Sequence, residues 1–209
     1  MHAPRSLLLL LALAACGPAQ SASSSSSPWT NPGEGAVGAT SGTEAERFFP
    51  LAHGYIWQYA TSSDEGDKGV LLIRAHRTDA LHGELRTSGG ARRIEYLPEG
   101  VGLAGRAAYI LKTPLAPGVT WTGEHGGRTR IVDTNMALTV PAGRFSGCIM
   151  TVEDTAEQPP FRYTTVFCPD VGITMLSVQA DAAEARAELR SYGPPVNIGP
   201  DGNSFTSDP

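Results

Sequence analysis

The side chains best suited to acid–base or metal chemistry in this chain are histidines, four of which lie beyond the N-terminal segment: His53, His76, His82 and His125. Metal binding or proton transfer would place them at fixed spacings from carboxylates, cysteines or one another, as in His-Glu-x-x-His. No such spacing occurs, although His76 and His82 fall on neighbouring expected strands and are the pair best placed to meet. The sequence also has no Gly-x-Ser-x-Gly elbow, Ser-x-x-Lys pair or phosphate-binding loop. We therefore predict that the protein is not an enzyme and that it uses no metal or cofactor.

Two cysteines in the second half of the chain, Cys148 and Cys168, lie symmetrically about residue 158 and flank the loop 155–160. If the segments around that loop pair as an antiparallel hairpin, the two thiols face each other, and in an exported protein they are expected to form a disulfide. Two free thiols, or a metal site lacking its other ligands, are the alternatives. A disulfide closing a loop of this size stabilises a fold by about 3 kcal/mol when it is unstrained. The same register predicts four favourable cross-strand pairs: Asp154 with Arg162, Thr151 with Thr165, Ile149 with Phe167, and Met150 with Val166.

The third cysteine, Cys16, ends an N-terminal segment with the three-part organisation of a secretory signal peptide. Arg5 supplies a positive charge, residues 6–14 are almost wholly leucine and alanine, and small residues precede Cys16. An apolar run of about nine residues is too short for a membrane span, which needs roughly 20. The pattern Leu-Ala-Ala-Cys resembles a lipobox, at which bacterial lipoproteins are cleaved and the new N-terminal cysteine is acylated. We therefore expect lipidation at Cys16, and a plain signal peptide is the alternative.

Composition divides the chain into four parts. Residues 1–15 form the signal peptide, and residues 16–42 form a Ser-, Gly- and Pro-rich tether that cannot bury enough apolar surface to fold. Residues 43–192 have the size of one ordinary domain, and residues 193–209 are expected to be a disordered tail. The net charge of −5 and the lack of a basic block argue against nucleic acid as a partner.

The folded part has the sequence pattern of an all-β domain. Short segments with a period of two are separated by turn-forming residues, and no helix-length pattern lies between them. We predict a single antiparallel meander curved into a barrel or half-barrel, which avoids a long exposed edge. A short helical turn, capped by Thr43 and Glu46, precedes it. The expected strands are Tyr55–Ser62, Gly69–Thr78, His82–Thr87, Ala91–Leu97, Ala107–Lys112, Thr120–Gly123, Thr129–Thr134, Ala137–Val140, Phe145–Asp154, Phe161–Phe167, Gly172–Val178 and Ala185–Tyr192.

One segment, Asp181–Arg190, gives conflicting signals. It is rich in Ala, Glu and Arg, which favour a helix, yet its charged and apolar residues alternate strictly. Such alternation is typical of a strand with one solvent-facing side. We give the periodicity precedence over the propensity and predict a strand.

Aromatic side chains concentrate in the expected strands, and four of them are the candidate ligand-facing residues: Tyr55, Trp57, Tyr59 and Trp121. The first three occupy alternate positions and so share one face of a strand. A curved sheet could present that face to an apolar ligand in its interior. The alternative, which is the commoner use of such residues, is that they fill the hydrophobic core.

Two longer motifs occur in the folded part. One is P-L-x-x-G-x-x-W-x-Y over residues 50–59, repeated in part over residues 114–121. The other is V-P-A-G-x-F-x-x-C over residues 140–148, followed by Tyr163 and by Val-Gly at residues 171–172. Together they resemble a group of bacterial secreted and lipoprotein domains, most of them uncharacterised, with antiparallel β folds. The resemblance implies export and a β fold, and it implies no reaction, substrate or catalytic residue.

These features predict an exported lipoprotein whose β domain acts, without catalysis, as a binding or structural module of the cell envelope. Gly17, where some lipoproteins have Asp, resembles the residue found in lipoproteins forwarded to the outer membrane, so we expect a location there, facing the periplasm. The expected partners are the membrane, through lipid on Cys16, and an envelope protein or an apolar ligand. The alternative function is a carrier or chaperone for lipid or another apolar ligand.

Overall fold

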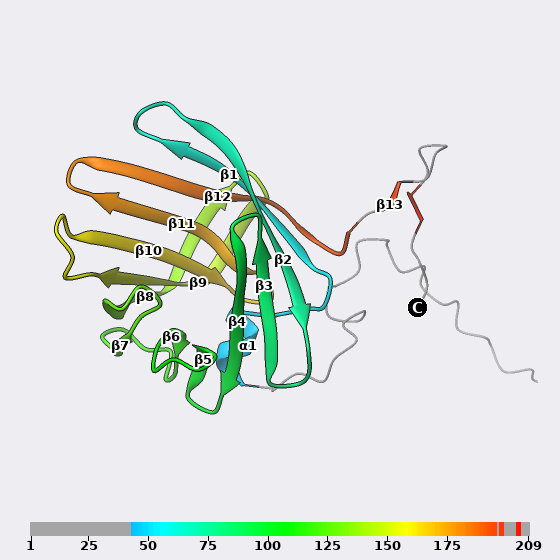
Figure 1. Ribbon diagram of the computed structural model, residues 1–209, viewed down its shortest axis with the longest axis horizontal. Helices are drawn as coiled ribbons and strands as arrows, with labels where there is room; N and C mark the ends of the chain where they lie inside the picture. Colours follow the sequence, from blue (N-terminus) through cyan, green and yellow to red (C-terminus); the bar gives the residue numbers. More distant parts are fainter. Residues whose placement is uncertain (1–42, 196, 199–203, 206–209) are drawn as a thin grey trace, which may run out of the picture. The chain divides into compact units, whose positions relative to one another are not determined.

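The computed structural model describes residues 43–195, 197–198 and 204–205, so the predicted signal peptide, Cys16 and the tether lie outside the described residues. The described part contains one short helix, a sheet of twelve strands and a separate two-stranded ladder (Figure 1). The helix is α1 (Glu44–Phe48). The strands of the sheet are β1 (Ile56–Ser63), β2 (Lys68–Arg77), β3 (His82–Thr87), β4 (Gly90–Leu97), β5 (Gly100–Leu103), β6 (Tyr109–Lys112), β7 (Thr120–Thr122), β8 (Arg128–Val140), β9 (Gly143–Asp154), β10 (Phe161–Cys168), β11 (Gly172–Ala180) and β12 (Ala183–Gly193).

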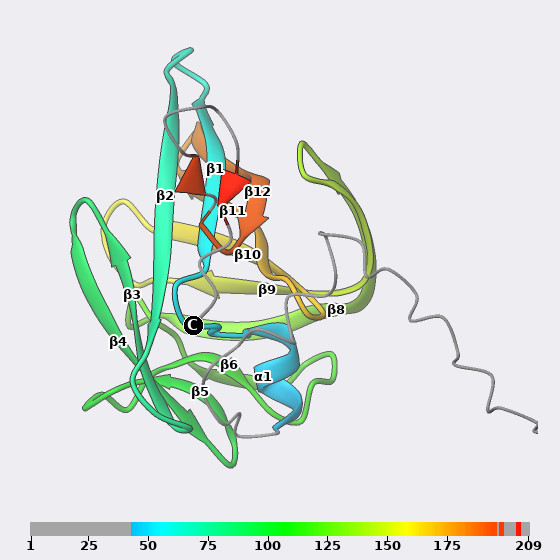
Figure 2. The same ribbon diagram turned by 90° about the vertical axis from the view of Figure 1, so that its right-hand side faces the viewer.

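The sheet is an antiparallel meander that also pairs its first strand, β1, with its last strand, β12. Its two edges are therefore β6 and β7, which are consecutive in the sequence. The sheet curls so strongly that these edges approach each other (Figures 1 and 2). Trp121 in β7 donates its Nε1 hydrogen to the carbonyl oxygen of Tyr109 in β6, with an N–O distance of 2.9 Å. The result is a nearly closed barrel, which confirms the fold class predicted from the sequence.

Most strands match their expected ranges to within a few residues, and two regions differ. The segments expected at residues 129–134 and 137–140 form one continuous strand, β8, because three register shifts in its ladder with β9 interrupt the alternation there. Strand β5 is not indicated by the pattern, because its sequence Gly-Val-Gly-Leu is buried throughout and does not alternate. The segment Asp181–Arg190 forms most of β12, which confirms that periodicity outweighs helix propensity there.

The β9–β10 hairpin has the register that the sequence predicts. Asp154, Thr151, Ile149 and Met150 pair with Arg162, Thr165, Phe167 and Val166 in that order. The expected disulfide between Cys148 and Cys168 is present, with an S–S distance of 2.02 Å and a Cα–Cα distance of 4.2 Å. Both cysteines are fully buried, so the disulfide belongs to the core.

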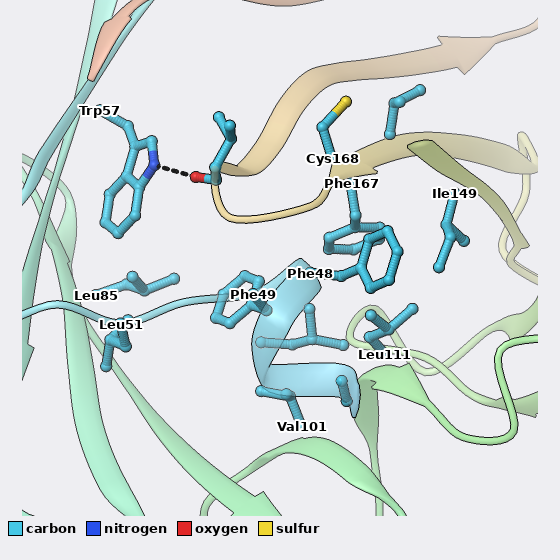
Figure 3. Close-up of a cluster of buried hydrophobic side chains, with 14 of the residues drawn as sticks. Phe48, Phe49, Leu51, Trp57, Leu85, Val101, Leu111, Ile149, Phe167 and Cys168 are labelled. Atoms are coloured by element: carbon cyan, nitrogen blue, oxygen red, sulfur yellow. Dashed lines mark hydrogen bonds between the residues drawn. The ribbon is translucent and has the colours of Figure 1, made fainter. Parts of the chain in front are cut away.

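Helix α1 packs at one end of the barrel, against β5 and β11. Thr43 caps it, since its Oγ1 accepts a hydrogen bond from the backbone N–H of Glu46. The Glu46 carboxylate forms a buried ion pair with Arg77 of β2, with Oε1 and NH1 2.7 Å apart. Figure 3 shows the side chains that fill this end of the interior, among them Phe48 and Phe49 beside Phe167.

The V-P-A-G-x-F motif forms the turn between β8 and β9 and attaches that hairpin to β12. The backbone N–H of Ala142 donates to the carbonyl oxygen of Leu189, at 2.9 Å. The Phe145 ring packs against Tyr192, with the ring centroids 6.4 Å apart. Gly143 has a φ of +136°, a conformation that residues with a Cβ rarely adopt, which accounts for a glycine at this position of the motif.

Part of the predicted disordered tail, residues 193–209, lies among the described residues. There, β13 (Asn197–Ile198) and β14 (Ser204–Phe205) pair as a short antiparallel ladder separate from the main sheet. Gly193 itself ends β12.

Candidate functional site

The interior of the barrel is filled at the end that α1 covers, and beyond that filled end it contains a cavity of about 800 Å³. This volume lies within the range of roughly 300–1,000 Å³ that small-molecule sites occupy. Its apolar wall is formed mainly by Phe49, Leu71, Ile73, Leu85, Ile110, Phe167, Ile173 and Leu176. Ten of the twelve barrel strands contribute lining residues, so the cavity belongs to the barrel interior and not to a surface loop.

The cavity exists because inward-facing side chains become smaller along the strands. On β10 the fully buried Phe167 lies two positions from Thr165, which lines the cavity. On β9 the fully buried Ile149 likewise lies two positions from Thr151. Thr165 and Thr151 are cross-strand partners and both line the cavity. Residues two apart on a strand point to the same face. On each of these strands, therefore, the inward-facing side chain changes from large and apolar to small and polar from one position to the next.

The same change occurs on β1, from the buried Tyr59 to Thr61, and on β8, from the buried Ile131 to Thr129. All four of these threonines line the cavity. Thr129 is buried, and its Oγ1 has no hydrogen-bond partner among the residues that the structure describes. A buried hydroxyl without a partner costs free energy, so this atom favours a ligand or water that would bond to it.

A buried carboxylate, Glu153 of β9, organises one corner of the cavity. Its Oε1 accepts hydrogen bonds from the backbone N–H groups of His125 and Gly127, at 2.9 and 2.8 Å. Its Oε2 accepts one from Nδ1 of His125, at 3.0 Å. Burial alone would raise the pKa of Glu153, but these hydrogen bonds outweigh it and hold the pKa below its usual range. Glu153 is therefore a carboxylate at neutral pH, and Nδ1 of His125 carries the proton.

The His125 ring is fixed from a second side by Tyr163 of β10. The two rings are parallel to within 3°, and their centroids are 3.6 Å apart. Nε2 of His125 faces Oε1 of Glu124 at 3.8 Å. The same Glu124 oxygen pairs with the guanidinium of Arg92, which lies on β4. Charged side chains thus run across the mouth of the cavity, from β9 through the β7–β8 turn to β4.

A histidine oriented by a buried carboxylate is also found in acid–base catalysis, where its second nitrogen serves a substrate or nucleophile. At Nε2 of His125 the described contact is with the Glu124 carboxylate, which is not a nucleophile that a base would activate by removing a proton. The arrangement presents a fixed imidazole and a guanidinium beside an apolar cavity. Within residues 43–195 and the short ladder, no group of three or more His, Cys, Asp or Glu side chains is arranged to hold a metal ion.

The four candidate ligand-facing aromatic residues lie in the core, and none of them lines the cavity. The indole Nε1 of Trp57 donates to the carbonyl oxygen of Val171 at 2.8 Å (Figure 3). Tyr59 donates its hydroxyl to Ile173 in the same way, at 2.9 Å. Trp121 makes the β7–β6 bond described above, and Tyr55 is buried, which raises its pKa to about 12. These residues fill the hydrophobic core, where the polar tips of Trp57, Tyr59 and Trp121 bond to the backbone, whereas the buried Tyr55 hydroxyl has no hydrogen-bond partner among the described residues.

His76 and His82 lie on the neighbouring strands β2 and β3, but their described contacts are with other residues. His76 contacts His53, with ring centroids 4.7 Å apart, while His82 bonds through Nδ1 to Asp79 at 2.9 Å. The sequence does not identify the residues of the polar corner as a group. His125 and Glu153 are 28 residues apart and belong to different elements, the β7–β8 turn and β9, so no short motif contains both.

In the part of the chain that the structure describes, no helix is long and apolar enough to cross a membrane. No protein-family model matches the chain, and no curated protein matches it.

This chain is similar to several solved structures, among them two bacterial proteins. One is a protein inferred to be exported, with a YmcC-like fold, from Bacteroides fragilis NCTC 9343. It has a TM-score of 0.43 and 11% sequence identity, over 69% of this chain and 98% of that one. The other is a protein inferred to be a lipoprotein, from Parabacteroides distasonis ATCC 8503. It has a TM-score of 0.40 and 13% identity, over 69% of this chain and 97% of that one.

Proposed function

We propose that this protein is an exported, lipid-anchored carrier of the bacterial cell envelope that binds an apolar or amphiphilic small molecule inside its β barrel. The observation that carries the proposal is the cavity of about 800 Å³ with an apolar wall, in a barrel whose other end is densely filled. A module with a purely structural role has no need of such a space, because an unfilled apolar interior destabilises a fold. The protein acts by binding and not by catalysis.

The anchor in this proposal is lipid on Cys16, and the tether 17–42 separates the domain from the membrane. Acyl chains on the cysteine would hold the protein firmly, since each buried CH₂ contributes about 0.8 kcal/mol. Gly17 after the acylated cysteine supports a location in the outer membrane, facing the periplasm. Replacing Cys16 by Ala and fractionating the cells tests the anchor: the variant should leave the membrane pellet. Sedimentation of this variant with membranes would contradict lipid anchoring.

The bound molecule is to be sought by native mass spectrometry and by organic extraction of the protein purified from its own envelope. Thr165 faces the cavity, whereas its neighbour Thr164 does not line it. We therefore expect Thr165→Phe to lose the extracted ligand and Thr164→Phe, which adds the same bulk outside the cavity, to keep it. If the wild-type protein carries nothing and binds no member of an amphiphile panel, the carrier function is wrong.

A further inference from the structure

The charged corner at the mouth of the cavity holds a carboxylate of the protein itself. The Glu124 side chain lies with Oε1 in an ion pair with Arg92 and 3.8 Å from Nε2 of His125. Glu124 belongs to the turn between β7 and β8 and not to a strand, so it can move without disrupting the sheet. Arg92 and His125 both line the cavity. The position between them is therefore a carboxylate-binding position that opens onto an apolar space.

The fixed groups around this position are built before any ligand arrives. Glu153 and the Tyr163 ring orient the imidazole, as described above. Desolvation of the Arg92 guanidinium, together with the nearby Arg106, lowers the pKa of Arg92, so a carboxylate held beside this guanidinium stabilises its charged form. In the same corner the cross-strand partner of Glu153 is Thr129, whose buried hydroxyl has no partner among the described residues. A carboxyl group has a second oxygen that can bond to such a hydroxyl, directly or through water.

We propose that the cavity takes a long-chain carboxylic acid, whose carboxylate displaces Glu124 from Arg92 and His125 and whose hydrocarbon chain lies against Leu71, Ile73 and Leu85. This inference rests on the proposed carrier function and assigns the chemical class of its ligand. Charge-assisted hydrogen bonds to a guanidinium are among the stronger polar contacts in proteins. Burial of the chain supplies most of the affinity, and the carboxylate supplies the selectivity.

The test measures binding of three ligands that share one hydrocarbon chain: palmitic acid, hexadecanol and hexadecyl phosphate. The protein is the full chain with Cys16→Ala, so that its own acyl groups cannot occupy the cavity, and the method is equilibrium dialysis below the aggregation limit of each ligand. We expect palmitic acid to bind at least about tenfold more tightly than hexadecanol, the ratio that one charge-assisted contact of about 1.4 kcal/mol gives. Glu124→Gln should tighten palmitic acid further, because it removes the competing carboxylate.

Arg92→Gln should reduce the binding of palmitic acid to that of hexadecanol, while hexadecanol binding stays unchanged and shows that the cavity is intact. Arg186→Gln is the matched control, because Arg186 also lines the cavity but pairs with Glu184 and Glu188, and it should leave the preference for the acid as it is. Equal affinity for the acid and the alcohol overturns the carboxylate assignment and leaves the carrier function standing. Tighter binding of hexadecyl phosphate than of palmitic acid also overturns it. Failure of all three to bind overturns the long-chain acid as ligand, and it overturns the carrier function itself if the protein purified from its own envelope also carries no extractable ligand.

Discussion

The ion pair between Glu46 and Arg77 fastens helix α1 to the barrel, and its removal should be costly. Both side chains are almost completely buried, at 8% and 4% exposure, and Oε1 and NH1 are 2.7 Å apart. Arg77 also donates from Nε to the carbonyl oxygen of Asp79 at 2.7 Å and bonds to the carbonyl of Ala80. Its guanidinium lies over the Tyr96 ring, 4.4 Å from the centroid. One arginine thus holds the helix, the β2–β3 turn and a core tyrosine together.

Glu46→Ala leaves the guanidinium of Arg77 buried without its carboxylate, which typically costs about 3–5 kcal/mol in the free energy of unfolding. For a domain of this size, 1 kcal/mol corresponds to roughly 2–4 °C, so the unfolding midpoint should fall by about 6–20 °C. Arg77→Met should cost more, because it removes the charge partner and also the donors to two backbone carbonyls. In the double variant both buried charges are gone, so its cost should be smaller than the sum of the single costs by about 1–3 kcal/mol.

Urea unfolding followed by circular dichroism gives the three free energies, and a fourth variant provides the control. Arg86→Met breaks the exposed pair with Glu84, whose atoms are 2.8 Å apart, and should cost only about 0–1 kcal/mol because solvent already screens that pair. A loss below about 1 kcal/mol for Glu46→Ala, or strictly additive single losses, would refute the reasoning that burial makes this pair strong.

Three further predictions concern the barrel wall. Replacing both Cys148 and Cys168 by Ala should lower the free energy of unfolding by about 3 kcal/mol, since the disulfide closes a loop with a sequence separation of 20; urea unfolding checks this, and an unchanged midpoint would contradict it. Gly123→Ala should destabilise by about 1–3 kcal/mol, because the added Cβ would overlap the Glu153 carboxyl, whereas Gly89→Ala, whose Cβ would meet nothing closer than 3.7 Å, should cost much less on the same thermal scan. The depressed pKa of Glu153 contributes stability above its unfolded value of 4.5 that is lost as the pH falls through the lower folded value. Stability should therefore drop on acidification below about pH 4.5 more steeply in the wild-type protein than in Glu153→Gln, and parallel curves would exclude this contribution.

The sequence predicts most of the fold because the relevant signals are local. Alternation identifies the strands even in Asp181–Arg190, where propensity favours a helix, since the register of one buried face repeats every two residues. The β9–β10 register follows from the symmetric placement of Cys148 and Cys168, and it holds because that ladder has no irregularity between Ile149 and Asp154. Where a ladder contains bulges, as in β8, the same argument fails and one strand is mistaken for two.

The candidate site could not be predicted in the same way. Its members come from β4, the β7–β8 turn, β8, β9 and β10, and they meet only once the barrel has curled. No short motif contains them all, and the spacings typical of metal ligands or activated nucleophiles do not include Arg92, Glu124 and His125. The aromatic residues show a second limit: alternation shows which face of a strand a side chain occupies, and it does not show how deep along the barrel that position lies, so a core role and a ligand-facing role cannot be separated in this way.

On β1 the position of a side chain along the barrel interior determines whether it belongs to the core or to the cavity. Trp57, Tyr59, Thr61 and Ser63 occupy alternate positions and share one face, yet the first two are buried in the core and the last two line the cavity. Large aromatic side chains therefore mark the part of the interior that is already occupied, whereas small polar side chains on the same face mark the part left for a ligand. In a barrel of this type the informative positions for function are the inward-facing threonines and serines next to large core residues. Substitutions at these positions test ligand binding, whereas substitutions at Trp57 or Tyr59 test the stability of the core.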